Sequence, residues 1–110
     1  MAPGCAYNKT FSRKIINGIL RQQLGFHGVT VTDSLTAPAP SAIPHAATKA
    51  MLAGSDLLIW GSESSVEAGY ATLLADAPGS SALRARLAQA SGRIRALKTW
   101  LTAHGGPSCS

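Results

Sequence analysis

An aspartate directly after a short β-branched run is the residue of this chain that is best placed to do chemistry. Residues 29–32 read Val-Thr-Val-Thr and are followed by Asp33. A strand so uniform in composition is typical of a buried parallel strand, and in α/β folds the ends of such strands form the concave face that carries the active site. An aspartate after a strand also commonly holds a turn through its side chain, and the spacing by itself favours that simpler role.

A helix and a proline-rich loop position this run. We expect a helix over residues 12–24, which Ser12 can cap and for which Gly25 supplies a left-handed stop. Prolines recur between residues 34 and 44, which excludes regular structure there, and Pro44 can open the next helix at its first position.

The remainder of the chain predicts one more strand and further helices. The helix after Pro44 reaches Gly54, and residues 56–60 form a second short apolar strand. Ser64 or Ser65 can start the next helix. The final helix has a long apolar stripe, made of Leu83, Leu87, Ala90, Ile94, Leu97 and Leu101. Helix, strand, helix, strand predicts an α/β fold with a parallel sheet.

Length and composition limit the chain to one small unit. It has 110 residues, of which 45% are hydrophobic and 14% charged, so it can bury one core, and its surfaces favour a piece that meets neighbours. We expect the folded unit over residues 1–103 and a flexible tail over residues 104–110. No stretch approaches the roughly 20 apolar residues that cross a bilayer, so no membrane contact is expected. Cys5 and Cys109 lack metal-ligand spacing, and we expect neither a metal nor a cofactor.

Basic residues outnumber acidic ones. Ten Lys and Arg against five Asp and Glu give a net charge of +5. The last helix contains no acid but five cations, which are Arg84, Arg86, Arg93, Arg95 and Lys98. Such a row attracts polyanions, but no aromatic residues are interleaved to stack bases. We therefore interpret the row as a solvated helix face, expect no nucleic-acid partner, and interpret Asp56 as a turn or cap residue.

Five segments of this chain stand in an order typical of one enzyme family. They are Phe11-Ser12-Arg13-Lys14-Ile15-Ile16, Leu24-Gly25-Phe26-His27-Gly28-Val29, Val31-Thr32-Asp33-Ser34-Leu35, Ala53-Gly54-Ser55-Asp56-Leu57-Leu58 and Arg93-Ile94-Arg95-Ala96-Leu97-Lys98. Together they resemble the family 3 glycoside hydrolases, which include β-glucosidases and β-N-acetylhexosaminidases. The resemblance implies a partial TIM-type (β/α)8 barrel, in which this chain supplies the last two βα units with flanking helices, as two short parallel strands and four helices.

The resemblance also implies a role for Asp33. The nucleophilic aspartate of the family falls on this residue, which would attack the anomeric carbon to form a glycosyl-enzyme intermediate. His45 and Trp60 follow the two strands at the same end, and they are the candidate substrate-binding residues, although Trp60 could equally fill the barrel top. His27 enters the first strand from the opposite end and is interpreted as structural or exposed.

Two functions remain open at this point. The first is a fragment of a retaining β-glycosidase, β-N-acetylhexosaminidase-like, whose substrate in a complete barrel is a β-glycoside. The segments of the family that carry the acid/base and most sugar-binding residues have no counterpart in this sequence, so we expect the chain to be inactive alone. The alternative is a non-enzymatic α/β remnant that acts as an interaction module or homo-oligomer through its unpaired sheet edges.

Overall fold

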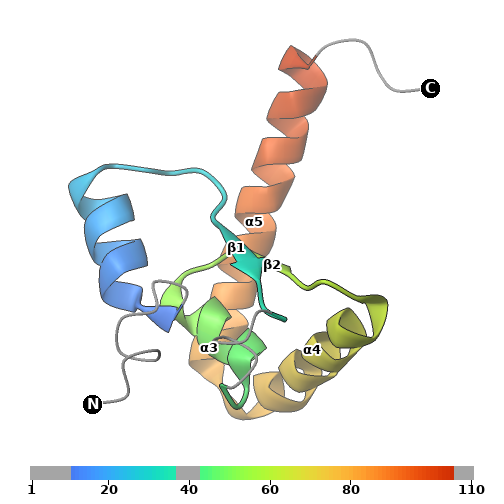
Figure 1. The fold of residues 1–110 in the computed structure, drawn as a ribbon. Coiled ribbons are helices and arrows are strands. Elements are labelled where there is room, and N and C mark those ends of the chain that lie inside the picture. The colour runs from blue at the N-terminus through green and yellow to red at the C-terminus, as the bar shows by residue number, and fades with distance from the viewer. Residues whose placement is uncertain (1–10, 37–42, 106–110) are drawn as a thin grey trace.

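The computed structural model describes residues 11–36 and 43–105, and it places two short strands beside a layer of helices (Figure 1). In chain order the elements are η2 (Lys14–Gln23), β1 (Val31–Ser34), α3 (Ala46–Ala53), β2 (Leu57–Ile59), α4 (Glu63–Asp76), η3 (Ala77–Gly79) and α5 (Ser81–His104). This is the mixed α/β arrangement predicted from the sequence. Part of the proline-rich loop, both cysteines and residues 106–110 of the expected tail lie outside the described ranges.

The two strands form a parallel pair, as predicted. Val31 lies opposite Leu57 and Ser34 lies opposite Ile59, with an irregularity in the register between these positions. The intervening α3 connects the end of one strand to the start of the other, which is the connection that a parallel pair needs.

The first strand begins later than predicted, and it includes Asp33 instead of ending before it. The backbone oxygen of Thr30 accepts the N–H groups of both Asp56 and Leu57, and the N–H of Thr30 donates to the Asp56 carboxylate at 3.1 Å. The starts of the two strands are therefore joined both through the backbone and through the Asp56 side chain.

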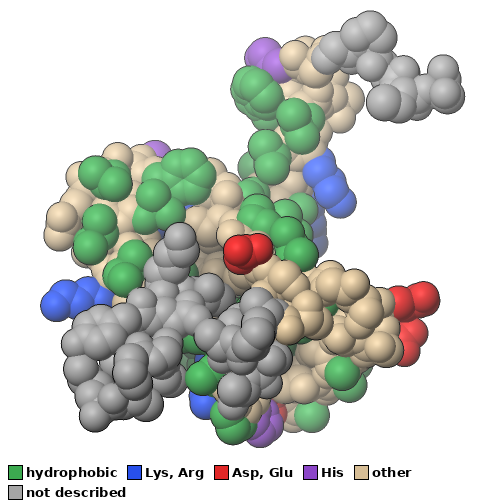
Figure 2. All heavy atoms as spheres, in the orientation of Figure 1, with side chains coloured by type: hydrophobic (Ala, Val, Ile, Leu, Met, Phe, Trp, Pro, Cys, Tyr) green, Lys and Arg blue, Asp and Glu red, His purple; other side chains and the backbone are tan. Residues whose placement is uncertain are grey.

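Among the residues that the structure describes, helices cover one face of this sheet and leave the other open. Thr32 is buried beneath the helices, and Leu58 packs against the core. The opposite side, which we call the open face, is made of Val31, Asp33, Leu57 and Ile59, all exposed. Figure 2 shows hydrophobic side chains gathered over η2 and the two strands. The expectation of a buried strand is therefore wrong for the described residues, since Val31 is 52% exposed. Parallel sheets normally have both faces covered.

The hydrophobic core lies between α3, α4, α5 and β2. Its centre is formed by Met51, Leu83 and Ala90, and it is surrounded by Leu52, Leu58, Leu73, Ala77 and Leu87. The apolar stripe predicted on the last helix is buried along the first half of α5 only. Its second half extends past the rest of the molecule (Figure 1), and Leu97 and Leu101 are exposed.

The first helix differs from the prediction in type and in length. Element η2 is a π-helix over Lys14–Gln23, not a helix over residues 12–24. The hydroxyl of Ser12 accepts the N–H of Ile15 at 3.2 Å, so Ser12 does cap this turn. Gly25 has a φ of 71°, which is the predicted left-handed stop.

Two other helices also begin at residues that differ from the predicted ones. The cap of α4 is Ser62, whose hydroxyl accepts the N–H of Ser65, and not Ser64 or Ser65. Pro44 is not the first residue of a helix, because α3 begins at Ala46. Within the described ranges, no helix has both the length and the apolar composition required to cross a membrane.

Candidate functional site

Asp33 lies on the open face, with its carboxylate exposed. The described residues give its side chain one hydrogen bond, from the backbone N–H of Ser34 to Oδ1 at 2.8 Å. The residue borders a groove of about 480 Å³ between η2 and β1, whose other walls are largely apolar and include Ile15, Ile19 and Phe26. The second carboxylate oxygen is therefore available to a substrate atom that enters this groove.

The structure brings His45 and Trp60 together, but not with Asp33. Both line a pocket of about 360 Å³ that is bounded by the residues following β1, the start of α3, and α4. The indole ring of Trp60 lies against the buried Gly69 of α4, where any Cβ atom would collide with the ring. Glycine at this position therefore lets the helix approach the tryptophan.

His45 is held by a partner that the sequence does not reveal. Its Nδ1 lies 2.8 Å from Oδ2 of Asp76, and the hydroxyl of Thr48 donates to the same oxygen at 2.6 Å. These hydrogen bonds, that of Thr48 first, lower the pKa of Asp76 below its usual range. His45 also has a φ of 53°, a left-handed conformation that non-glycine residues seldom adopt. In the described part of the chain, no group of three His, Cys, Asp and Glu side chains could hold a metal ion.

Asp56 is the centre of a buried ion-pair cluster, so its interpretation as a turn or cap residue is wrong. Its Oδ2 accepts from Nη2 of Arg21 at 2.8 Å and from the backbone of Thr30. Its Oδ1 accepts from Nη2 of Arg86 at 3.0 Å and from Nη1 of Arg93 at 3.1 Å. One carboxylate thereby joins η2 and α5 beneath the sheet.

The cluster also corrects the interpretation of the last helix as a solvated row of cations. Arg86 is 7% exposed and donates to the backbone oxygens of Met51 and Ser55 as well as to Asp56. Burial alone would raise the pKa of Asp56, but the hydrogen bond from Thr30 and the two α5 arginines outweigh it and lower that pKa. The carboxylate is therefore ionised at neutral pH.

Sequence reasoning missed this cluster, although one signal was present. Arg86 and Arg93 are seven residues apart and so share one side of the helix. A helix with five cations and no acid needs counter-charge from elsewhere, and Asp56 directly precedes a strand that the helix covers. The pairing itself spans 30 to 37 residues, a distance over which local patterns carry no information.

Comparisons with known proteins point to glycoside hydrolases. The model of the Glycosyl hydrolase family 3 N terminal domain matches residues 7–97. The fold is similar to that of the β-N-acetylhexosaminidase from Beutenbergia cavernae DSM 12333, with 34% identity and a TM-score of 0.75 over 83% of this chain and 28% of that chain. No curated protein matches the chain.

The fold is also similar to that of CbsA from Thermotoga neapolitana. The TM-score is 0.74 at 22% identity, over 86% of this chain and 21% of that chain. For the zinc-bound form of CbsA the TM-score is 0.77 at 20% identity, over 90% and 22% of the two chains. The chain therefore spans less than a third of the length of each of these solved structures.

Proposed function

Because the chain belongs to the family 3 glycosyl hydrolases, we propose that it forms the last two βα units of a (β/α)8 barrel in which Asp33 is the nucleophile of a retaining β-glycosidase. The observation that carries this proposal is the place of Asp33 on the open face, next to the carboxyl end of β1. The strands of a barrel point alternate residues into its interior, and barrel active sites lie at the carboxyl ends of the strands. The open face has the composition of such an interior, since its other members are Val31, Leu57 and Ile59.

The chemistry follows from the geometry of a retaining hydrolase. A carboxylate oxygen of Asp33 attacks the anomeric carbon, the glycosidic C–O bond breaks, and an acid gives its proton to the leaving oxygen. The deprotonated form of that acid then takes a proton from a water molecule. The water attacks the glycosyl ester, which releases the sugar and regenerates the carboxylate of Asp33. A carboxyl group in this role lies about 5 to 5.5 Å from the nucleophile. The groove that Asp33 borders is lined by no second acid and no histidine of the described residues, so we assign the proton donor to other units of the barrel.

The proposed substrate is a β-glycoside of the β-N-acetylhexosaminidase type. This choice is supported by the 34% identity with the Beutenbergia cavernae enzyme. We propose that His45 and Trp60 border the sugar, because each follows a strand at the end where Asp33 stands. The hydrogen bond to Asp76 orients the imidazole ring of His45, which leaves Nε2 to meet a sugar hydroxyl.

The isolated chain of 110 residues is expected to release no measurable aglycone from aryl β-N-acetylglucosaminides or aryl β-glucosides. A missing proton donor costs about 10² to 10⁴ in rate, and the loss of substrate positioning costs more. A chromogenic assay on purified protein measures this. Turnover that survives purification but disappears in Asp33→Ala would contradict the expectation and show that this chain assembles a site by itself.

The nucleophile is tested in a hybrid barrel, by which we mean this chain co-expressed with the part of the 34% identical relative that it does not match. A mechanism-based fluoroglycoside traps the glycosyl-enzyme, and mass spectrometry of the digested protein locates the sugar. We expect the label on the peptide that contains Asp33, and none when Asp33→Asn is used. A label on any other residue refutes the assignment.

A second candidate function is that of a self-associating module without activity. The observation in its favour is the apolar surface left open in the described residues, where Val31, Leu57, Leu97 and Leu101 are all more than a third exposed. Unpaired edges of a sheet favour association between chains. A homo-oligomer with ordered, saturable assembly and no label in the hybrid barrel would support this function over the enzymatic one.

A further inference from the structure

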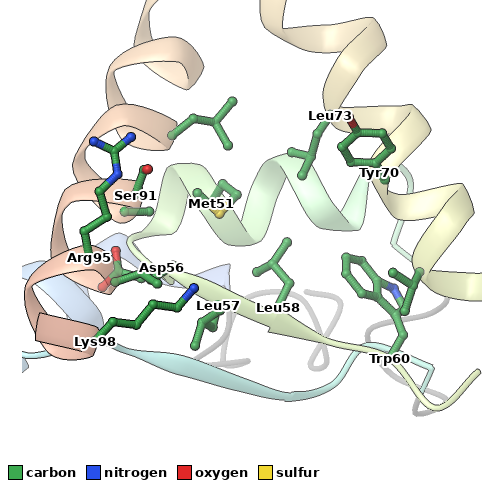
Figure 3. A pocket seen from close by; sticks show the side chains of 14 residues that line it. Met51, Asp56, Leu57, Leu58, Trp60, Tyr70, Leu73, Ser91, Arg95 and Lys98 are labelled. Carbon is green, nitrogen blue, oxygen red and sulfur yellow. The ribbon is translucent and has the colours of Figure 1, made fainter. Parts of the chain in front are cut away.

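We infer that the β2 side of this chain docks an acidic, amphipathic βα unit of the remaining barrel, an inference that rests on the barrel proposed above. By the β2 side we mean the edge of β2 away from β1, together with the groove between α4 and α5 (Figure 3). Four features of this surface specify its occupant: a largely apolar groove, a strand edge that no described strand pairs with, an exposed helix stripe, and two cations that form no ion pair with a described residue.

The groove is largely apolar and has a volume of about 450 Å³. Leu57 and Leu58 of β2 line one side together with Trp60, which directly follows that strand, while Tyr70 and Leu73 line the other side from α4 (Figure 3). No residue of β1 takes part, so the groove belongs to the outer side of β2. Tyr70 is 63% exposed, and an apolar surface of this kind gains free energy when another apolar element covers it.

The strand edge beside the groove is open to a further strand. The N–H of Leu57 and the backbone oxygen of Ile59 both bond toward β1, to Thr30 and Leu35. The N–H and C=O of Leu58, which lies between them, therefore point to the opposite edge. In the described ranges β2 pairs with β1 alone. A strand of the occupant can form hydrogen bonds with the backbone of Leu58 at this edge. Parallel pairing is compatible with β2, because β2 already pairs in parallel with β1.

The exposed second half of α5 requires that the occupant also contain a helix, which covers the apolar stripe there. The stripe of α5 is fully buried at Leu83 and nearly so at Ala90, but it is 41% exposed at Leu97 and 49% exposed at Leu101. Ile94, between these halves, lines the groove. The uncovered stripe is therefore continuous with the groove, and a strand followed by an amphipathic helix covers both.

The charge of the occupant follows from Arg95 and Lys98. Both line the groove from α5 (Figure 3). The other α5 cations have partners in the described residues: Arg86 and Arg93 bind Asp56, and Arg84 donates to the backbone oxygens of Ala77 and Pro78. Arg95 and Lys98 form no ion pair with any described residue. A carboxylate of the occupant compensates the charge that its docking would otherwise desolvate.

A second copy of this chain fits the surface less well. The chain has a net charge of +5, so two copies repel each other. Two of its five acids are already committed, Asp56 to three arginines and Asp76 to His45. The opposite edge of the sheet, beside η2, has a groove of the same size that no Lys or Arg lines. The two edges of the sheet therefore differ in charge. This difference lets the remaining part of the barrel dock in one orientation only.

The test measures the affinity between this chain and the unmatched part of the 34% identical relative. At low salt we expect Arg95→Glu/Lys98→Glu to weaken the association by at least about tenfold, and to remove most of the salt dependence that the unaltered chain shows. Lys49→Glu is the matched control, because Lys49 is also exposed but lies on α3, outside the groove. It should change the affinity by less than about twofold. Circular dichroism checks that each variant is folded.

Several results would overturn the inference. Failure of the unaltered chain to form a complex with the relative's unmatched part would contradict it. An equal loss of affinity with Lys49→Glu, or an affinity that Arg95→Glu/Lys98→Glu leaves unchanged, would contradict it as well. A stable dimer of this chain alone that the double reversal dissociates would place a second copy in the groove. Asp33→Asn must bind as tightly as the unaltered chain. A failure of docking is therefore distinguishable from a failure of the nucleophile assignment, which the fluoroglycoside label reports separately.

Discussion

In the hybrid barrel, we expect Asp33→Asn to lower the turnover of an aryl β-glycoside by more than about 10³-fold, the scale on which an enzyme loses activity with its nucleophile. Asparagine has nearly the same shape as aspartate, so the groove beside η2 is retained, but its amide oxygen is a far poorer nucleophile. His27→Ala is the control, since His27 is exposed in the turn before β1 and is expected to leave turnover nearly unchanged. Activity within tenfold of the unaltered barrel would contradict the assignment.

A second readout separates loss of a nucleophile from loss of structure. The variant Asp33→Ala leaves a space on the open face, into which a small anion such as azide can enter. Azide then attacks the anomeric carbon directly, and the expected product is a glycosyl azide with inverted anomeric configuration. A variant that is inactive because its fold is damaged would not be rescued. Rescue in the control His27→Ala should be absent, because its own nucleophile is still present.

We expect Asp56→Asn to lower the free energy of unfolding by about 3 to 5 kcal/mol, which is the usual cost of breaking a buried ion pair. The Asp56 side chain is fully buried, and its loss leaves Arg21, Arg86 and Arg93 facing one another without a counter-charge. Small domains have a total stability of about 5 to 15 kcal/mol, so the variant should be unfolded or nearly so. Denaturant titration followed by circular dichroism measures the change.

The matched control for Asp56→Asn is Glu67→Gln, which removes an exposed carboxylate with no ion pair in the described residues. It should alter stability by no more than about 0.5 kcal/mol. A loss for Asp56→Asn that is no larger than this control would show that the cluster does not hold η2 to α5.

The pH dependence of stability gives an independent check on Asp56. Folding lowers the pKa of this carboxyl, so its contribution is present above the unfolded-state pKa, near 3.9, and is lost as the pH falls through the lower, folded-state value. The unaltered chain should therefore lose stability steeply on acidification below about pH 4. A stability of the unaltered chain that does not fall below about pH 4 would contradict this contribution of Asp56.

The sequence by itself determined the features that depend on near neighbours. The order of helices and strands follows from the spacing of apolar residues, and the stop at Gly25 follows from the left-handed conformation that glycine adopts without cost. The same local rules put Asp33 in the strand-end segment and predicted the parallel pairing of two short strands, because a helix separates them. The family was also accessible, since its motifs are short contiguous segments, and the match over residues 7–97 confirms it.

Only the tertiary structure decided what residues distant in the sequence do to one another. Asp56 became a buried centre because two turns of α5 and one of η2 bring arginines to it from distant parts of the chain. His45 took a left-handed conformation beside Asp76, 31 residues away. The exposure of Val31 likewise could not be derived, because burial depends on which elements cover a strand and not on the composition of that strand. Local patterns record the preferences of each segment, whereas ion pairs and burial depend on three-dimensional neighbours that those patterns do not encode.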